Sequence, residues 1–325
     1  DSSGKFLFKF GQYGHGDGEF DYPSELAIDK SGKIYVADQR NHRIQVFDSS
    51  GEFLFKFGRC THEEMMRQYH LTDDDGNFIG EREQVCGHGK NKWGIGHADG
   101  ELHSPSDVTV DKSGKIYVAD MQHAEVQVFD SSGKFLFKFG GGTTCEYINN
   151  MSGLKRCNSP DGKFVFANRI LVDDFGKVYV SDTENDRIQV FDSSGKFLFK
   201  FGKYGHENGE FDEPYDMALD SLGRLYVVDI YNNRVQIFDK LGRFIDKFGY
   251  YCQMSNNLGL HDWHHQKCID ADETGPLEPG DGGFTYTHGV AVDNNSSRVY
   301  VLDYGNNRVQ VYEWQETKKN EWFHH

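Results

Sequence analysis

Side chains that can bind a transition metal gather in one stretch of the sequence. His97, His103 and His123 follow one another there within short loops. The segment DMQHAE also places Met121 and Glu125 on either side of His123. Imidazole together with a thioether suits copper, whereas imidazole together with a carboxylate suits zinc. These residue types therefore predict a metal site that holds copper or zinc.

Carboxylates recur at one fixed place, the entrance to the first apolar run of five similar segments. The residues at this place are Glu25, Asp107, Arg169, Asp216 and Gly289. Calcium accepts several carboxylate oxygens, so the three acidic residues predict either a calcium site or a hydrated acidic surface balanced by Arg169. His288 lies next to this place in the fifth segment and is a fourth histidine that we expect to bind metal.

A repeated segment must position all of these side chains. Its first copy, residues 27–58, contains four alternating apolar runs separated by DKSG, DQRNH and DSSG, which predicts a four-stranded antiparallel meander. The third and fourth copies, aligned at Asp173 and Asp220, are 47 residues apart. Four strands in a period of this length are typical of a β-propeller blade. The sequence thus predicts an all-β protein.

Five copies predict five blades. The last copy ends after its third strand, whereas the chain begins with DSSGKFLFKFG, which reads as a lone fourth strand. We therefore expect Phe6–Phe10 to pair beside Arg308–Tyr312 and to close the last blade, which leaves no free sheet edge. A sixth blade within residues 59–100 is the alternative, although this segment is short for four strands.

The sequence of the copies resembles the NHL repeat family of β-propellers. The residues that carry the resemblance are YVAD, the following NHRIQVFDSSG and the closing KFG, and the five copies cover about two thirds of the chain. The resemblance implies the fold and no single activity, because the family includes lyases, RNA-binding domains and extracellular receptor modules. The peptide-amidating lyases resemble this family and hold zinc with histidines at the entrances to first strands. Of the residues at the corresponding places in this chain, only His288 is a histidine.

The second copy departs from the others in the turn between its second and third strands. The other four copies carry an asparagine and an arginine in this turn, where the second copy has His123 and Glu125. Functional sites often lie where a repeat breaks its own pattern. This departure locates the predicted metal site on blade two.

One face of the propeller is predicted to carry the remaining loops of interest. The chain exceeds the bare repeat at residues 59–96, 141–160 and 250–280, which are all connections between blades. These connections and the turns between second and third strands lie at the same end of every blade, here called the top face. Apart from His324 and His325, every histidine maps to it. The three insertions should form a collar around the mouth of the central channel.

The cysteines support this arrangement. Each insertion holds two of the six cysteines, which gives the pairs Cys60–Cys86, Cys145–Cys157 and Cys252–Cys268. Three local disulfides would each contribute about 3 kcal/mol in the loop-entropy model, and they predict an oxidising, extracytoplasmic location. A structural metal held by cysteines is the rival interpretation, but the sequence has no CxxC pair.

Composition excludes several classes of function. The net charge is −16, with 51 acidic against 35 basic residues, and no long basic run could contact phosphates, so nucleic acid is not an expected partner. No apolar run reaches the length of a transmembrane helix. The chain contains no GxSxG and no glycine-rich loop between a strand and a helix, so no nucleotide cofactor is expected.

The sequence therefore predicts a secreted β-propeller that forms a single domain over residues 1–325. Its top face should bind a metal ion and a small-molecule or protein ligand, and the metal could be catalytic. Oxidoreductase, lyase and hydrolase chemistry all stay open. The alternative is a non-enzymatic module that binds a protein or a glycan through the collar.

Peptide mapping under non-reducing conditions tests the cysteine assignment. We expect one disulfide within each insertion, because the two cysteines of an insertion are close in sequence. A disulfide that joins two different insertions would overturn the assignment.

Overall fold

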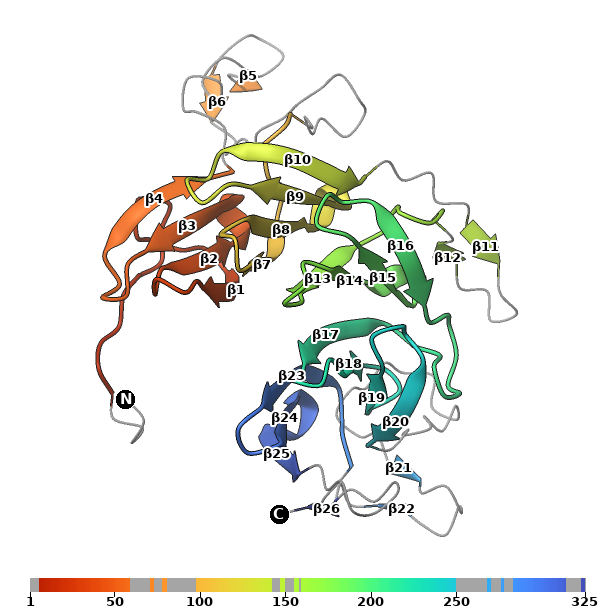
Figure 1. Ribbon diagram of the computed structural model, residues 1–325. Helices are drawn as coiled ribbons and strands as arrows, with labels where there is room; N and C mark the ends of the chain where they lie inside the picture. The colour runs from red at the N-terminus through yellow and green to blue at the C-terminus, as the bar shows by residue number, and fades with distance from the viewer. Residues whose placement is uncertain are drawn as a thin grey trace. The chain divides into compact units, whose positions relative to one another are not determined.

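The protein consists almost entirely of β-strands. The computed structural model describes residues 6–58, 71–72, 78–80, 98–141, 147–149, 155–157, 159–249, 268–269, 276–277, 283–313 and 323–324. They form five four-stranded antiparallel sheets, the blades of a β-propeller (Figure 1). The predicted fold class and the choice of five blades are confirmed. No helix within these ranges is long and apolar enough to span a membrane.

The strands follow the four apolar runs of each copy. Blade one contains β1 (Pro23–Ile28), β2 (Ile34–Asp38), β3 (Arg43–Phe47) and β4 (Phe53–Phe57). Blade two contains β7 (Pro105–Val110), β8 (Ile116–Asp120), β9 (Glu125–Phe129) and β10 (Phe135–Gly140). Blade three contains β13 (Ala167–Val172), β14 (Val178–Asp182), β15 (Arg187–Phe191) and β16 (Phe197–Phe201).

Blade four contains β17 (Pro214–Leu219), β18 (Leu225–Asp229), β19 (Arg234–Phe238) and β20 (Phe244–Phe248). Blade five contains β23 (Thr287–Asp293), β24 (Arg298–Asp303), β25 (Arg308–Glu313) and β26 (Phe323–His324). Short two-stranded sheets lie within the insertions: β5 (Leu71–Thr72) with β6 (Phe78–Gly80), β11 (Tyr147–Asn149) with β12 (Lys155–Cys157), and β21 (Cys268–Ile269) with β22 (Pro276–Leu277). The three disulfide pairs fall largely outside the described residues and stay a prediction.

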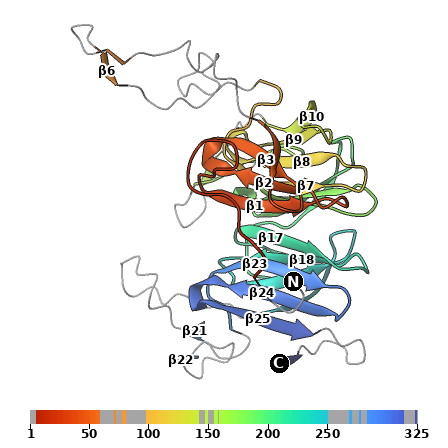
Figure 2. The same ribbon diagram turned by 90° about the vertical axis from the view of Figure 1, so that its left-hand side faces the viewer.

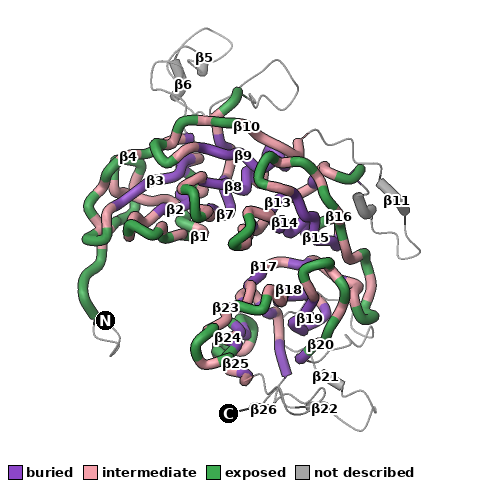
Figure 3. The backbone as a smooth tube through the Cα atoms, in the orientation of Figure 1, coloured by how far each residue is buried: buried purple, intermediate pink, exposed green. Residues whose placement is uncertain are grey.

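The chain divides into two compact units. Unit 1, residues 1–143, contains blades one and two, and unit 2, residues 144–325, contains blades three to five. Each has its own apolar core, built mainly by second and third strands, which are the most deeply buried parts of the tube in Figure 3. Figure 2 shows the sheets of each unit from the side. A single domain over the whole chain stays a prediction.

Neighbouring blades within a unit are joined by the last phenylalanine of each fourth strand. The ring of Phe57 packs on Phe129 of blade two at 4.7 Å, and that of Phe201 packs on Phe238 of blade four at 4.8 Å. Phe10 contacts Phe47 of blade one in the same way, with ring centroids 4.9 Å apart. Phe10 therefore occupies the place of the last residue of a fourth strand.

The predicted closing strand nevertheless needs correction. Residues 6–10 belong to no strand, and β25 pairs with β26 through Tyr312 with His324 and Glu313 with Phe323. The connection from β25 to β26 is short, and a short loop costs little entropy to close, whereas the N-terminal segment lies almost the whole chain away. His324 thus belongs to a strand, although no sequence pattern predicted it.

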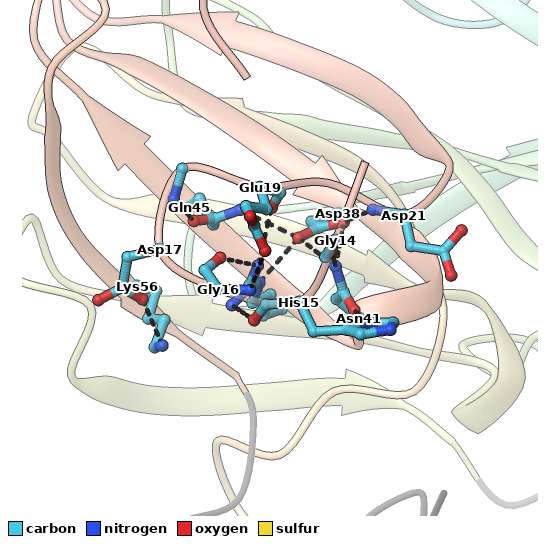
Figure 4. A network of polar contacts seen from close by, with 12 residues as sticks. Gly14, His15, Gly16, Asp17, Glu19, Asp21, Asp38, Asn41, Gln45 and Lys56 are labelled. Carbon is cyan, nitrogen blue, oxygen red and sulfur yellow. Dashed lines mark hydrogen bonds and ion pairs between the residues drawn. The ribbon is translucent and has the colours of Figure 1, made fainter. Parts of the chain in front are cut away.

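A buried aspartate at the end of each second strand organises the top of the blade. In blade one, Asp38 is fully buried and accepts hydrogen bonds from Arg43 Nε at 2.7 Å and from Gln45 Nε2 at 3.0 Å (Figure 4). Asn41 Nδ2 also donates to Asp38, at 2.9 Å, and Arg43 in turn donates to the carbonyl oxygens of residues 15, 16 and 19. The ion pair thereby fixes the connection to the blade.

Two variants distinguish stabilisation by the Phe10 ring from stabilisation by strand pairing of the N-terminal segment. Phe10→Ala should lower the free energy of unfolding by about 2 kcal/mol, because it removes the ring packed on Phe47. Deletion of residues 1–8 removes Phe6, Leu7 and Phe8, which are exposed by 73%, 63% and 47%, and should shift Tm by no more than about 2 °C. A drop of many degrees for this deletion would show instead that the segment completes a blade.

Removal of a buried arginine tests the aspartate network. Arg43→Ala should cost about 3 to 5 kcal/mol in chemical denaturation, because it leaves the buried Asp38 carboxylate without its cation. Arg40→Ala is the matched control. Arg40 is 65% exposed and lies 3.8 Å from Asp21, so its loss should cost about 1 kcal/mol or less. Equal effects of the two changes would contradict the proposed role of the network.

Candidate functional site

Blade two keeps the buried aspartate but changes its partners. Asp120 faces Glu125 directly across β8 and β9, at the register position where the other blades pair aspartate with arginine. His123 occupies the place of the asparagine and donates from Nδ1 to Asp120 Oδ2 at 2.7 Å. Gln127 Nε2 keeps its bond to the same oxygen, at 2.9 Å. The hydrogen-bond network of blade two therefore keeps the arrangement around the aspartate but has a negatively charged glutamate where the other blades have a positively charged arginine.

The altered partners place two carboxylates together in the interior. Asp120 is fully buried and Glu125 is 5% exposed. Like charges directly opposite each other destabilise a sheet. Burial raises the pKa of Glu125, although Lys138, whose Nζ lies 3.3 Å from Glu125 Oε1, acts in the opposite direction. Lys138 also lies 3.4 Å from Asp99, so one ammonium group serves two carboxylates.

Imidazole rings lead from this network to blade one. The centroids of the His103 and His123 rings are 5.4 Å apart, and those of His42 and His103 are 5.1 Å apart. The backbone amide of His103 donates to Asp120 Oδ1 at 2.8 Å, and that of Ser104 donates to His42 Nδ1 at 3.0 Å. Backbone contacts thus hold the histidines of this row in place.

Three of these side chains have the geometry of metal ligands. Ligand atoms of Asp120, His123 and Glu125 all lie within 4.8 Å of one another, and all three residues are buried. Within the described ranges no other group of three histidine, cysteine or acidic residues meets this condition. Nδ1 is the ring nitrogen of His123 that faces Asp120, so a metal held by all three residues would replace the proton that now joins His123 to this carboxylate.

The structure places the other predicted ligands elsewhere. Glu25 lies in β1 and Asp107 in β7, where Asp107 Oδ1 accepts a hydrogen bond from the Val108 amide at 2.7 Å. Asp216 in β17 accepts one from the Val290 amide at 2.8 Å. None of the three belongs to the group of Asp120, His123 and Glu125. His97 lies outside the described residues, and the calcium site stays a prediction.

His288 lies in unit 2 among aromatic rings. It belongs to β23, and its ring is 5.2 Å from that of Tyr215 and 4.8 Å from that of Tyr304. Burial and the nearby charge of Arg169 lower the pKa of His288, so its imidazole is neutral at pH 7.

The histidines of the recurring Gly-His pairs have a structural role in blades one and four. His15 Nδ1 donates to Asn41 Oδ1 at 2.6 Å, and His206 Nδ1 donates to Asn232 Oδ1 at 2.5 Å. The asparagine is therefore the link between the Gly-His loop and the buried aspartate. Blade two has His123 in place of this asparagine, and His97 is the corresponding Gly-His residue in the sequence.

Sequence reasoning missed Asp120 as a candidate ligand. This aspartate is present in every copy, so it carried no signal when departures from the repeat were sought. The aspartate ends the YVAD run, and in the other copies the arginine stands two residues beyond the asparagine. Pairing these two positions across the hairpin would have placed Asp120 opposite Glu125.

Comparison with known proteins agrees with the fold. The NHL repeat family pattern matches residues 20–47, 102–129, 211–238 and 284–312. The chain is 30% identical to Protein brain tumor of Drosophila melanogaster over 201 residues, 61% of this chain and 14% of that protein. It is also 30% identical to B-box type zinc finger protein ncl-1 of Caenorhabditis elegans over 155 residues, 40% of this chain and 16% of that protein. The chain thus spans less than a fifth of the length of either relative.

Solved structures show the same architecture at low sequence identity. Hydrazine synthase of Kuenenia stuttgartiensis superposes with a TM-score of 0.50 at 13% identity, over 93% of this chain and 79% of that one. A chain of a nidogen/laminin complex gives a TM-score of 0.50 at 15% identity, over 93% and 80%. These similarities concern the fold alone. With four matched repeats and five four-stranded blades, the chain belongs to the NHL-repeat family of β-propellers.

Proposed function

We propose that this protein is a binding module whose top face is stabilised by a zinc ion on blade two. The observation that carries the proposal is the replacement of the arginine by Glu125 opposite the buried Asp120. The exchange adds a negative charge where the other blades have a positive one. A divalent cation bound at this place would neutralise the pair as the guanidinium does in blades one, three, four and five.

The donor set favours zinc over copper. Carboxylate and imidazole ligands are common at zinc sites, and His103 lies close enough to His123 to supply a fourth ligand. Met121, the residue that suggested copper, is less buried than His123 and Glu125. His97 is a further proposed ligand, because its place in the repeat corresponds to His15 and His206, which contact the residue that His123 replaces.

Burial supports a structural rather than a catalytic role. Catalytic zinc sites keep an open position for water or substrate, whereas structural sites are closed by protein ligands. His123 and Glu125 are each only 5% exposed and Asp120 is fully buried, so the group has no direct access to solvent. We therefore favour the non-enzymatic alternative, with the metal holding the connection to blade two in the way that Arg43 holds the connection to blade one.

We further propose that the module works outside the cytoplasm. Three disulfide-linked insertions on the top face would form a collar that contacts a protein or small-molecule ligand. The even distribution of the six cysteines supports this proposal, as does the acidic surface that disfavours nucleic acid.

Metal analysis and thermal unfolding test the site with variants that restore the repeat. The untagged wild-type protein should bind about one equivalent of zinc, and zinc at about 100 times Kd should stabilise it by about 2.7 kcal/mol. The double variant His123→Asn with Glu125→Arg should fold at least as stably as the metal-free wild type and should lose the zinc-dependent increase in Tm. His206→Ala, in the blade-four loop, should keep zinc binding.

Acid should weaken zinc binding, because protons compete for the same ligands. Free imidazoles protonate below about pH 6, and the raised pKa of Glu125 means that this carboxyl begins to take up a proton at a higher pH than an ordinary glutamate. Less than a tenth of an equivalent of any transition metal in protein from metal-replete medium would contradict the proposal. Protons and Lys138 would then balance the two carboxylates.

A further inference from the structure

A row of stacked flat groups crosses blades three to five in unit 2. The guanidinium carbon of Arg169, in β13, lies 4.9 Å from the ring centroid of Tyr215 in β17. Tyr215 is followed by His288 at 5.2 Å and by Tyr304 at 4.8 Å, the last two rings being inclined by only 24°. Arginine, tyrosine, histidine and tyrosine thus form one continuous stack.

Two more tyrosines border the stack. The ring of Tyr286 lies 5.0 Å from that of His288 and 6.1 Å from that of Tyr304. Tyr231 contacts Tyr286, with ring centroids 5.8 Å apart. The cluster therefore presents aromatic faces together with hydroxyl, imidazole and guanidinium groups.

The cluster is a departure from the repeat. Blades one and two have Ser24 and Ser106 where blades four and five have Tyr215 and His288. The first residue of the turn after the second strand is Gln39 in blade one and Tyr304 in blade five. Tyr215 and Tyr286 pack against the apolar core of unit 2, whereas Tyr304 remains 58% exposed. An exposed tyrosine at the end of a stack offers a face on which a further ring can pack.

We propose that this stack binds a sugar, with a pyranose ring packed on Tyr304. The apolar C–H face of a pyranose matches the aromatic face of Tyr304, and its hydroxyl groups match the phenol group of the neighbouring Tyr286, whose ring lies 6.1 Å from that of Tyr304. Tyrosine suits this use because it has an apolar ring and a polar tip. A quaternary ammonium ligand, which aromatic clusters also attract, is the competing occupant. The site uses residues of unit 2 only and does not depend on the metal of blade two.

Titration with small probes tests the proposal on the 325-residue chain. Methyl glycosides of glucose, galactose, mannose, N-acetylglucosamine and glucuronic acid are added in turn, and binding is followed by saturation-transfer NMR and calorimetry. At least one should bind the wild type, and Tyr304→Ala should weaken that binding by about tenfold, the loss of a well-packed ring. Tyr304→Phe, which keeps the ring, should retain most of the affinity.

Tyr22→Ala provides the matched control. Tyr22 is 61% exposed and its ring centroid lies 4.8 Å from the Arg40 guanidinium carbon, but it directly precedes β1 of blade one and is not part of the aromatic cluster of unit 2. This variant should bind the glycoside like the wild type. The proposal is overturned if no glycoside binds, if Tyr22→Ala and Tyr304→Ala lose affinity equally, or if tetramethylammonium binds at the stack in preference to every sugar.

Discussion

The buried aspartate at the end of each second strand is the interaction on which the blades of this protein depend. A carboxylate out of contact with water is costly unless it is paired and hydrogen-bonded. Asp38, Asp182, Asp229 and Asp303 meet this demand in the same way, with an arginine Nε at 2.7 Å. The arginine and glutamine of the third strand also bond to carbonyl oxygens of the preceding connection. One carboxylate therefore joins two strands, a turn and a loop.

Blade two differs from the other blades in this interaction, because its buried aspartate has no arginine partner. Its core and register are those of the other blades, and Phe129 and Val118 are buried as their counterparts are. The partners of the aspartate differ, since Glu125 replaces the arginine and His123 replaces the asparagine. A repeat can tolerate such an exchange when another cation takes the place of the guanidinium, and Lys138 alone must also serve Asp99. The metal proposal follows from this imbalance more directly than from the number of histidines.

The histidines illustrate how repetition and function can be confused. His15 and His206 contact asparagines of their own blades, so their recurrence reflects a shared loop structure. His123 stands where those asparagines stand, and His288 stacks between tyrosines of unit 2. Histidines that the sequence grouped on one face thus have different surroundings, and the two units hold two chemically distinct candidate sites.

The sequence by itself determined the blade count, the strand order and the location of the departures, because strand period and turn residues are local properties that each copy repeats. It also identified His103, His123 and Glu125 as residues of interest. Only the tertiary structure decided that Asp120 faces Glu125, that β25 pairs with β26, and that Arg169, Tyr215, His288 and Tyr304 form a stack. Cross-strand register and contacts between blades join residues far apart in the chain. No local pattern specifies which of the compatible partners a side chain meets.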